Sequence, residues 1–190
     1  MTTDLTTALR PTIVLTILFA ILLGIVYPLA MTGIGQALFP RQANGSLVRD
    51  AGGRVIGSAV VGQAFVGEGY FRTRPSAAGK GYDGLASSGS NLAPTSQALA
   101  DRVRADVVAR RAERVAGPLP ADLVTASGSG LDPDLSPAAA LAQVPRIARV
   151  RGMPVARVRT LVDAQTERSW LGADHVNVLA LNRALDAAAR

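Results

Sequence analysis

The feature that most constrains this chain is an uncharged run of 30 residues, from Pro11 to Pro40, with an arginine on either side. Eleven of the sixteen residues at positions 12–27 are Leu, Ile, Val or Phe. A helix needs about 20 apolar residues to cross about 30 Å of hydrocarbon. The run therefore predicts a transmembrane helix, because a buried core helix would not need so long an uncharged stretch. Pro28 lacks an N–H donor and is expected to kink the span or to end its regular part.

Small or hydroxyl-bearing residues recur at every fourth position of this predicted helix, at Thr12, Thr16, Ala20 and Gly24. Residues spaced in this way lie along one slowly drifting face of a helix. Helices in lipid associate through close packing of such small residues. The stripe therefore predicts a face that packs against a partner helix. The alternative is that these residue types are simply common in membrane helices.

Composition limits the chemistry and the number of domains. The chain has no cysteine, which excludes disulfides, thiolate metal sites and cysteine nucleophiles. Its single histidine, His175, excludes a multi-histidine metal site within one chain. We predict a short amino-terminal segment over residues 1–10, a transmembrane helix and exit over 11–40, and one soluble domain over 41–190.

The flanking charges leave the orientation of the span open. Arg10 precedes the run, whereas Arg41, Arg49 and Arg54 follow it closely. This count mildly favours a cytoplasmic location for the following domain, but long domains can cross a membrane regardless of such counts. The run is longer than the apolar core of a signal peptide, so we expect an uncleaved anchor.

The first part of the soluble domain predicts a strand pair and then a long loop. Apolar stretches flank Gly52-Gly53 within residues 46–65, and Val60-Val61 extends the second stretch. Residues 66–94 are rich in glycine, serine and proline. Loops this long in a compact domain usually have a function. We therefore expect residues 66–94 to contact a partner or a ligand.

Helical periodicity predicts four helices after this loop, over residues 95–116, 137–152, 154–166 and 177–189. The second is expected to be kinked or split at Pro145. A small early sheet followed by helices gives an α+β fold class.

Local signals indicate where these helices begin and what surrounds them. The first helix is expected to be capped by Thr95 or Ser96. Ser136 followed by Pro137 is a strong start for the second. Five arginines of the first helix are expected to form a solvated face: Arg102, Arg104, Arg110, Arg111 and Arg114.

The glycine- and serine-rich stretches do not match nucleotide-binding motifs. Gly128-Ser129-Gly130 lacks the Gly-Lys-Ser/Thr of a phosphate loop, and Gly79-Lys80-Gly81 lacks the following hydroxyl. The segment 87–91, with the sequence SSGSN, could cradle an anion with its backbone amides. The alternative is a structural turn that caps the helix beginning near Thr95.

Catalytic constellations are equally hard to find in the sequence. Ser76 and Lys80 are separated by one residue too many for Ser-x-x-Lys, and there is no Gly-x-Ser-x-Gly. No nucleophile is positioned to use His175, and Asp132 and Asp134 flank a proline in a turn. These patterns favour a non-catalytic partner protein over an exported hydrolase. A stand-alone membrane-anchored module that binds a ligand through its long loop is the alternative.

Five strings that follow the span, in order, carry a resemblance to a known family. They are YFRTRPSA (70–77), SSGSNLAPTS (87–96), DLVTASGSGLDPDLSPAAA (122–140), QVPRIARVRG (143–152) and VNVLALNRALD (176–186). With them, essentially the whole chain closely resembles the C subunit of the Kdp potassium-transporting ATPase, the KdpC family. The chain departs from the residues most common in the family at Ser88 and Ala93, where glycine is frequent.

The resemblance implies an accessory subunit that is not an enzyme and has no cofactor of its own. Its partners would be a potassium-selective pore-like subunit, a P-type ATPase subunit and a small single-span subunit. It would assist assembly and act as a catalytic chaperone that raises the ATP affinity of the ATPase subunit. The implied location is the bacterial cytoplasmic (inner) membrane, with a single span and an extracytoplasmic domain.

For the site, the resemblance points to partner or nucleotide contacts in two stretches. The candidate residues are Ser87, Ser88, Gly89, Ser90, Asn91 and Gln143. Direct contact with ATP is left open, because a domain outside the membrane cannot reach ATP in the cytoplasm. We therefore expect ATP to act through the partner subunit, with influence passing through the transmembrane helix and the seating of the domain.

Overall fold

A computed structural model describes residues 2–115 and 117–189 of the chain. The predicted end of a helix at Ala116 lies outside the described residues. The chain divides into two compact units, Met1–Leu47 and Val48–Arg190. The first unit is helical, and the second combines helices with short strands, so the predicted mixture of helix and sheet is confirmed.

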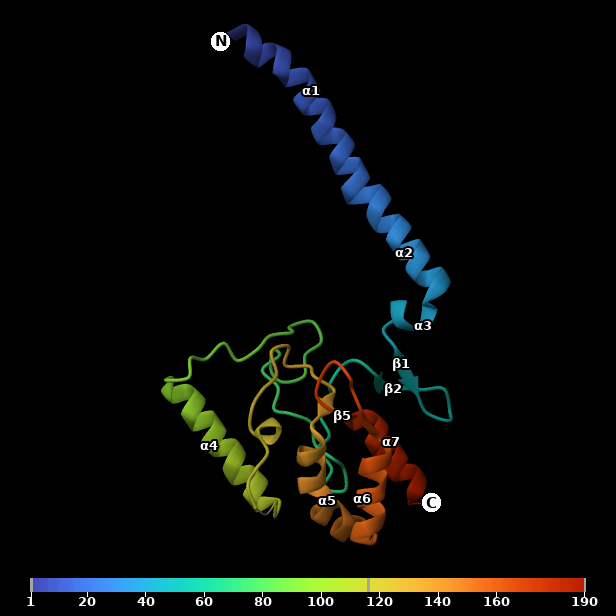
Figure 1. The fold of residues 1–190 in the computed structure, drawn as a ribbon, viewed down its shortest axis with the longest axis vertical. Coiled ribbons are helices and arrows are strands. Elements are labelled where there is room, and N and C mark those ends of the chain that lie inside the picture. Colours follow the sequence, from blue (N-terminus) through green and yellow to red (C-terminus); the bar gives the residue numbers. More distant parts are fainter. Residues whose placement is uncertain (1, 116, 190) are drawn as a thin grey trace. The chain divides into compact units, whose positions relative to one another are not determined.

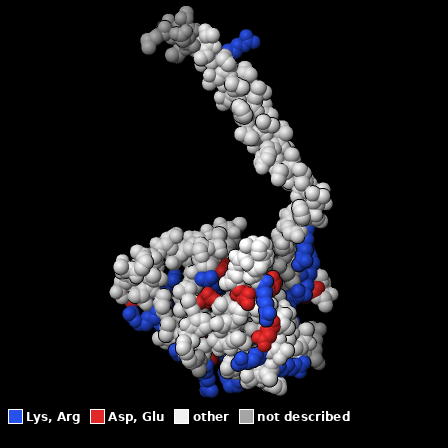
Figure 2. Space-filling model, in the orientation of Figure 1, with Lys and Arg blue, Asp and Glu red and all other residues white. Residues whose placement is uncertain are grey.

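The first unit is dominated by one long helix (Figure 1). It runs through α1 (Thr2–Ile21), the π-helical turn η1 (Leu22–Val26) and α2 (Tyr27–Leu38), and the short α3 (Pro40–Ala43) follows. Between Thr7 and Leu38 the helix is long and apolar enough to cross a membrane. Figure 2 shows it as a white, largely uncharged rod.

The helix continues through Pro28 and does not end there. In the turn before the proline, the N–H of Tyr27 donates to the carbonyl of Leu22, five residues back. A π-helical turn of this kind shifts the hydrogen-bond register just where proline cannot donate. The expected interruption at Pro28 therefore takes the form of one wide turn rather than a helix end.

The second unit begins with the predicted strand pair. β1 (Leu47–Arg49) pairs with β2 (Val55–Ser58) in a two-stranded sheet. The Asp50 carboxylate organises the turn, because its Oδ1 accepts the N–H of Arg54 at 3.0 Å. The predicted extension of the second strand through Val60 and Val61 is wrong, because the strand ends at Ser58 and the chain turns back through an isolated bridge to Val61.

A second sheet, which the sequence did not predict, lies in the carboxyl-terminal half. It is antiparallel with the order β3 (Asp134–Leu135), β5 (His175–Asn177), β4 (Thr166–Glu167). Leu135 and Thr166 both face Val176 across the ladder. Strands of two or three residues are too short to produce a visible period-2 pattern, so these segments resemble loops in the sequence.

Three helices pack with this sheet around the core, namely α5 (Pro137–Arg151), α6 (Val155–Ala164) and α7 (Val178–Ala188). Ser136 caps α5, as predicted, by accepting the Ala139 N–H on its hydroxyl. Of the kink or split predicted at Pro145, the split is wrong, because α5 is continuous. Pro145 is exposed, so water can reach the carbonyl that its ring leaves without a partner.

The remaining helix, α4 (Gln97–Ala112), is attached more loosely and has no buried residue among those described. Val103 and Val107 lie partly buried against the core, as their spacing predicted. Ser96 occupies the cap position without a side-chain capping bond. The buried residues on either side of α4 in the chain, Phe71 and Val115, belong to the core itself.

Candidate functional site

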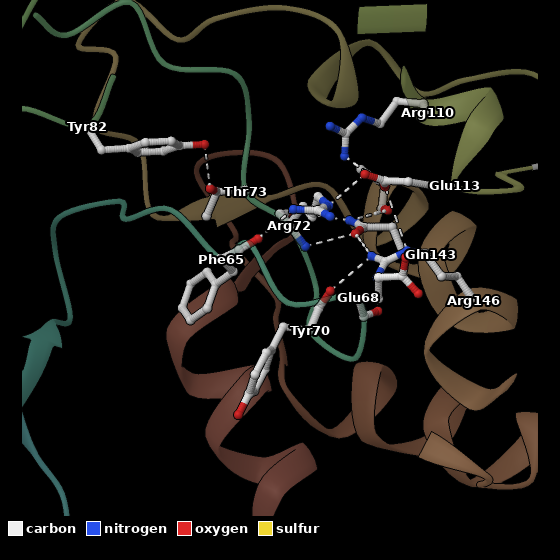
Figure 3. A network of polar contacts seen from close by, with 11 residues as sticks. Phe65, Glu68, Tyr70, Arg72, Thr73, Tyr82, Arg110, Glu113, Gln143 and Arg146 are labelled. Carbon is white, nitrogen blue, oxygen red and sulfur yellow. Dashed lines mark hydrogen bonds and ion pairs between the residues drawn. The ribbon is translucent and has the colours of Figure 1, made fainter. Parts of the chain in front are cut away.

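The carboxylate of Glu113, which follows α4 directly, is shared by three arginine side chains (Figure 3). Its Oε1 lies 2.7 Å from Arg72 Nε, and its Oε2 lies 3.0 Å from Arg110 Nη1 and 3.7 Å from Arg146 Nε. One carboxylate thus joins the end of α4 to α5 and to the long loop. We call these four residues the Glu113 network.

Gln143, on α5, completes this network from the interior. Its side chain is 1% exposed. Its Oε1 accepts the Arg72 N–H at 2.8 Å and Arg146 Nη2 at 2.9 Å. Its Nε2 donates to the carbonyls of Arg72 at 3.1 Å and Ala139 at 3.3 Å. Both ends of the amide are therefore occupied by the protein itself, and Gln143 holds the loop on α5.

Arg146 is the most deeply buried cation of the network, with its side chain 2% exposed. It donates to the carbonyl of Tyr70 at 2.9 Å and to that of Glu68. Burial lowers the pKa of Arg146 to about 10, and the nearby Glu113 carboxylate opposes this shift. The guanidinium stays charged at neutral pH and fixes the backbone of residues 68–70.

Further contacts hold the same loop against α7. Asn182 accepts the Phe71 N–H at 2.8 Å and donates to the Phe71 carbonyl at 3.0 Å. Arg151 lies over the Tyr70 ring, 4.6 Å from its centroid, and pairs with Asp186 at 2.7 Å. The predicted loop over residues 66–94 is confirmed as irregular, but its first half is anchored in the core.

A cavity of about 180 Å³ lies beside the network, lined in part by Phe65, Tyr82, Asp106 and Arg110. Burial raises the pKa of the Asp106 carboxyl, against the opposing charges of Arg102 and Arg110. The hydroxyl of Tyr82 donates to the Arg74 carbonyl at 2.7 Å. The Tyr82 hydroxyl is thus tied to the backbone of the long loop, whereas the buried Oδ2 of Asp106 has no hydrogen-bond partner in the described part of the chain.

The serine-rich segment 87–91 forms a structural turn against residues 127–130. The Ser88 N–H donates to the Ser129 carbonyl at 2.9 Å, and the Ser87 hydroxyl donates to the same carbonyl at 3.0 Å. Gly89 lies so close to the 127–130 loop that a Cβ atom added to Gly89 would be only 3.0 Å from the carbonyl oxygen of Gly128. The segment therefore packs on the 127–130 loop, and the prediction that it caps α4 is wrong.

The stripe on the long helix has no neighbour among the described residues of the first unit. Thr12, Thr16, Ala20 and Gly24 are exposed. The Thr12 hydroxyl donates to the Ala8 carbonyl at 2.8 Å, and a Cβ on Gly24 would meet nothing within 4 Å. Gly24 lies in the wide turn η1, which displaces it from the α-helical register of the other three. Packing against a partner helix stays a prediction.

The predicted candidates fall into separate networks. Gln143 contacts Arg72 and Arg146, whereas segment 87–91 contacts the 127–130 loop. Among the described residues, no group of three or more His, Cys, Asp or Glu side chains is arranged to hold a metal ion.

Sequence reasoning missed the Glu113 network and misplaced one of its members. Arg110, expected on a solvated face, has a side chain only 17% exposed and pairs with Glu113, so that prediction is wrong. Arg104 and Arg111 are exposed, as predicted. The available signal was a lone glutamate at the end of an arginine-rich helix, with an arginine at position 146 inside an apolar stretch.

Comparisons with known proteins agree over nearly the full chain. The family model KdpC, described as "K+-transporting ATPase, c chain", matches residues 9–187. A potassium-transporting ATPase KdpC subunit from Caulobacter vibrioides is 57% identical over 182 residues, which cover 94% of this chain and 92% of that protein. The protein of the same name from Myxococcus xanthus is 55% identical over 185 residues, covering 95% and 86%. That from Acidobacterium capsulatum is 54% identical over 181 residues, covering 94% and 97%.

Proposed function

Given that this chain belongs to the KdpC family of potassium-transporting ATPase subunits, we propose that it is a non-catalytic accessory subunit of an ATP-driven, high-affinity potassium uptake complex. It is needed for assembly, and it acts as a catalytic chaperone that raises the ATP affinity of the P-type ATPase subunit. The observation that carries this proposal is the family match over residues 9–187, which takes in both the apolar helix and the domain.

The partners in this proposal are a potassium-selective pore-like subunit, the P-type ATPase subunit and a small single-span subunit. The long helix anchors the chain in the bacterial cytoplasmic membrane with a single span, and the large domain is extracytoplasmic. The exposed stripe at Thr12, Thr16, Ala20 and Gly24 packs against a helix of a partner. Membership of a family of transport ATPase subunits favours this function over that of a stand-alone ligand-binding module.

ATP acts through the partner subunit rather than by binding to this chain. Two contacts support this part of the proposal. The amide of Gln143 is fully engaged in the interior, and the backbone of Ser88 is tied to Ser129. Neither group is free to recognise a nucleotide without breaking the packing of the long loop. The influence on ATP affinity therefore passes through the span and the seated domain.

Reconstitution tests the function directly. The complex is purified with and without this chain, and the ATP concentration for half-maximal potassium-stimulated hydrolysis is measured together with complex recovery. We expect omission to lower recovery and to raise that concentration, while ATP shows no saturable binding to the full chain alone. Unchanged recovery and ATP dependence after omission would contradict the proposal. Saturable ATP binding to the isolated chain would contradict the indirect route.

The absence of cysteine makes the side of the membrane easy to test. Lys80→Cys places one thiol on an exposed position of the long loop, and Thr3→Cys places one before the span. A membrane-impermeant maleimide should label position 80 in intact cells and position 3 only after the cells are opened. The reverse pattern would place the domain in the cytoplasm.

A further inference from the structure

The loop between β4 and β5, residues 168–174, carries two large apolar side chains into solvent. Trp170 is 91% exposed and Leu171 is 79% exposed. Single exposed apolar residues are ordinary, but an adjacent tryptophan and leucine, both almost fully exposed, form a concentrated apolar tip. Trp170 is also the chain's single tryptophan.

Two long hydrogen bonds lie within this loop. The Ser169 N–H contacts Asp174 Oδ1 at 3.4 Å, and the Leu171 N–H donates to the Ser169 hydroxyl at 3.3 Å. Below the tip, Glu167 pairs with His175 in the antiparallel ladder. The two paired strands thus hold both ends of the loop that carries Trp170 and Leu171.

An acidic hollow of about 360 Å³ borders the base of the same loop. Its lining includes four carboxylates and two basic side chains, namely Asp122, Asp132, Asp134, Asp174, Arg74 and His175. Arg74 is already paired with Asp132 at 3.0 Å. The hollow is therefore locally negative on a chain whose net charge is +6.

We propose that the Trp170–Leu171 tip and the acidic hollow form one docking surface for a partner protein subunit of the same complex. The matching surface of the partner subunit would offer an apolar socket for the tip and a lysine or arginine side chain for the hollow. Buried tryptophans are the typical anchors of protein interfaces. This inference rests on the proposed function, because it takes the partner from the same complex.

Charge favours a protein over a lipid surface as the occupant. A tryptophan–leucine tip alone would also suit the interface of a bilayer. However, the carboxylates beside the tip would face anionic lipid headgroups and be repelled by them. A protein that offers an apolar socket beside a basic side chain matches both halves of the surface, and the charge contact also sets the orientation of docking.

Photocrosslinking in the whole complex tests the surface. Trp170 is replaced by p-benzoylphenylalanine in the full chain, which is co-expressed with the other subunits in membranes and illuminated. The matched control places the same residue at Val108, an apolar position on α4 that is 63% exposed. We expect an adduct with a partner subunit from position 170, in at least about fivefold greater yield than from position 108.

Two further variants test the contributions of the tip and the hollow. Trp170→Ala with Leu171→Ala should speed loss of the partner after dilution by about tenfold, because truncation of interface anchors acts mainly on the dissociation rate. Asp174→Arg should have an effect in the same direction that diminishes in high salt, whereas Asp163→Arg, on the exposed side of α6, should not. Circular dichroism verifies that each variant is folded.

The outcomes separate this inference from the proposed function. If the complex is recovered intact but position 170 yields lipid adducts, no adducts, or the same yield as position 108, the docking surface is wrong while the proposed function stands. Unchanged dissociation in the double alanine variant would also overturn the docking surface. If the unmodified chain recovers no partner subunits at all, the proposed function itself fails.

Discussion

Replacing Glu113 with glutamine should destabilise the domain strongly, because three arginines share this one carboxylate. The substitution leaves the guanidinium groups of Arg72, Arg110 and Arg146 facing one another without the negative charge that now joins them. Removing one member of a buried ion pair costs about 3–5 kcal/mol. Glu113 itself is 18% exposed, so water screens part of the repulsion and we expect about 3 kcal/mol.

Thermal unfolding of the full chain in mild detergent, followed by far-ultraviolet circular dichroism, measures this loss. At about 2–4 °C per kcal/mol for a domain of this size, the midpoint should fall by about 6–12 °C. Asp101→Asn is the matched control, because it removes an exposed helix pair in which Arg104 lies 2.6 Å away. An exposed pair of this kind contributes about 0.3–0.5 kcal/mol.

A double-mutant cycle identifies the source of the effect. Arg146→Met is combined with Glu113→Gln, and the sum of the single losses is compared with the loss in the double variant. We expect the double variant to lose about 1–3 kcal/mol less than that sum, because the two side chains contact each other. A Glu113→Gln loss no larger than that of Asp101→Asn would refute the reasoning, as would strict additivity in the cycle.

Three further predictions follow from contacts in the domain and from the exposed helix. Gln143→Leu should lower stability by about 2–4 kcal/mol in denaturant titrations, because it leaves buried groups of the loop unpaired; normal stability with weakened ATP dependence of the complex would contradict the structural role. Gly130→Ala should lower the midpoint of thermal unfolding clearly more than Gly117→Ala. Both glycines have a positive φ, at +66° and +73°, but only a Cβ added to Gly130 would clash with the backbone, 2.5 Å from the Ser88 carbonyl oxygen. Ala20→Leu with Gly24→Leu should reduce co-purification of partner subunits without reducing membrane insertion, and normal recovery would show that the stripe is incidental.

Local sequence signals were sufficient wherever a short segment decides its own structure. Ser136, Gly152 and Asn177 mark helix ends, and each does so through its own hydrogen bond or its own left-handed backbone. The apolar run likewise specifies its long helix without help from the domain. Such features depend on neighbours within about four residues, so they can be read from the sequence.

The errors arose where tertiary contacts override the local pattern. Pro145 was expected to interrupt α5, but the helix packs against α6 and keeps the proline on its exposed side. Residues 134–135 and 166–167 become strands because both pair with β5. No short-range pattern encodes these pairings, because paired residues such as Leu135 and Val176 are far apart in the sequence.

The same reasoning explains why the candidate site was predicted only in part. Gln143 was predicted as a candidate for contact with a partner or a nucleotide, which stays a prediction, whereas its place in the structure depends on Arg72, 71 positions away in the sequence. A buried glutamine that binds both the N–H and the carbonyl of one distant residue behaves as a structural clamp. The residues that remain free to recognise a partner are therefore those that the core does not use. By this criterion the exposed Trp170–Leu171 tip is a stronger candidate for contact than the buried amide.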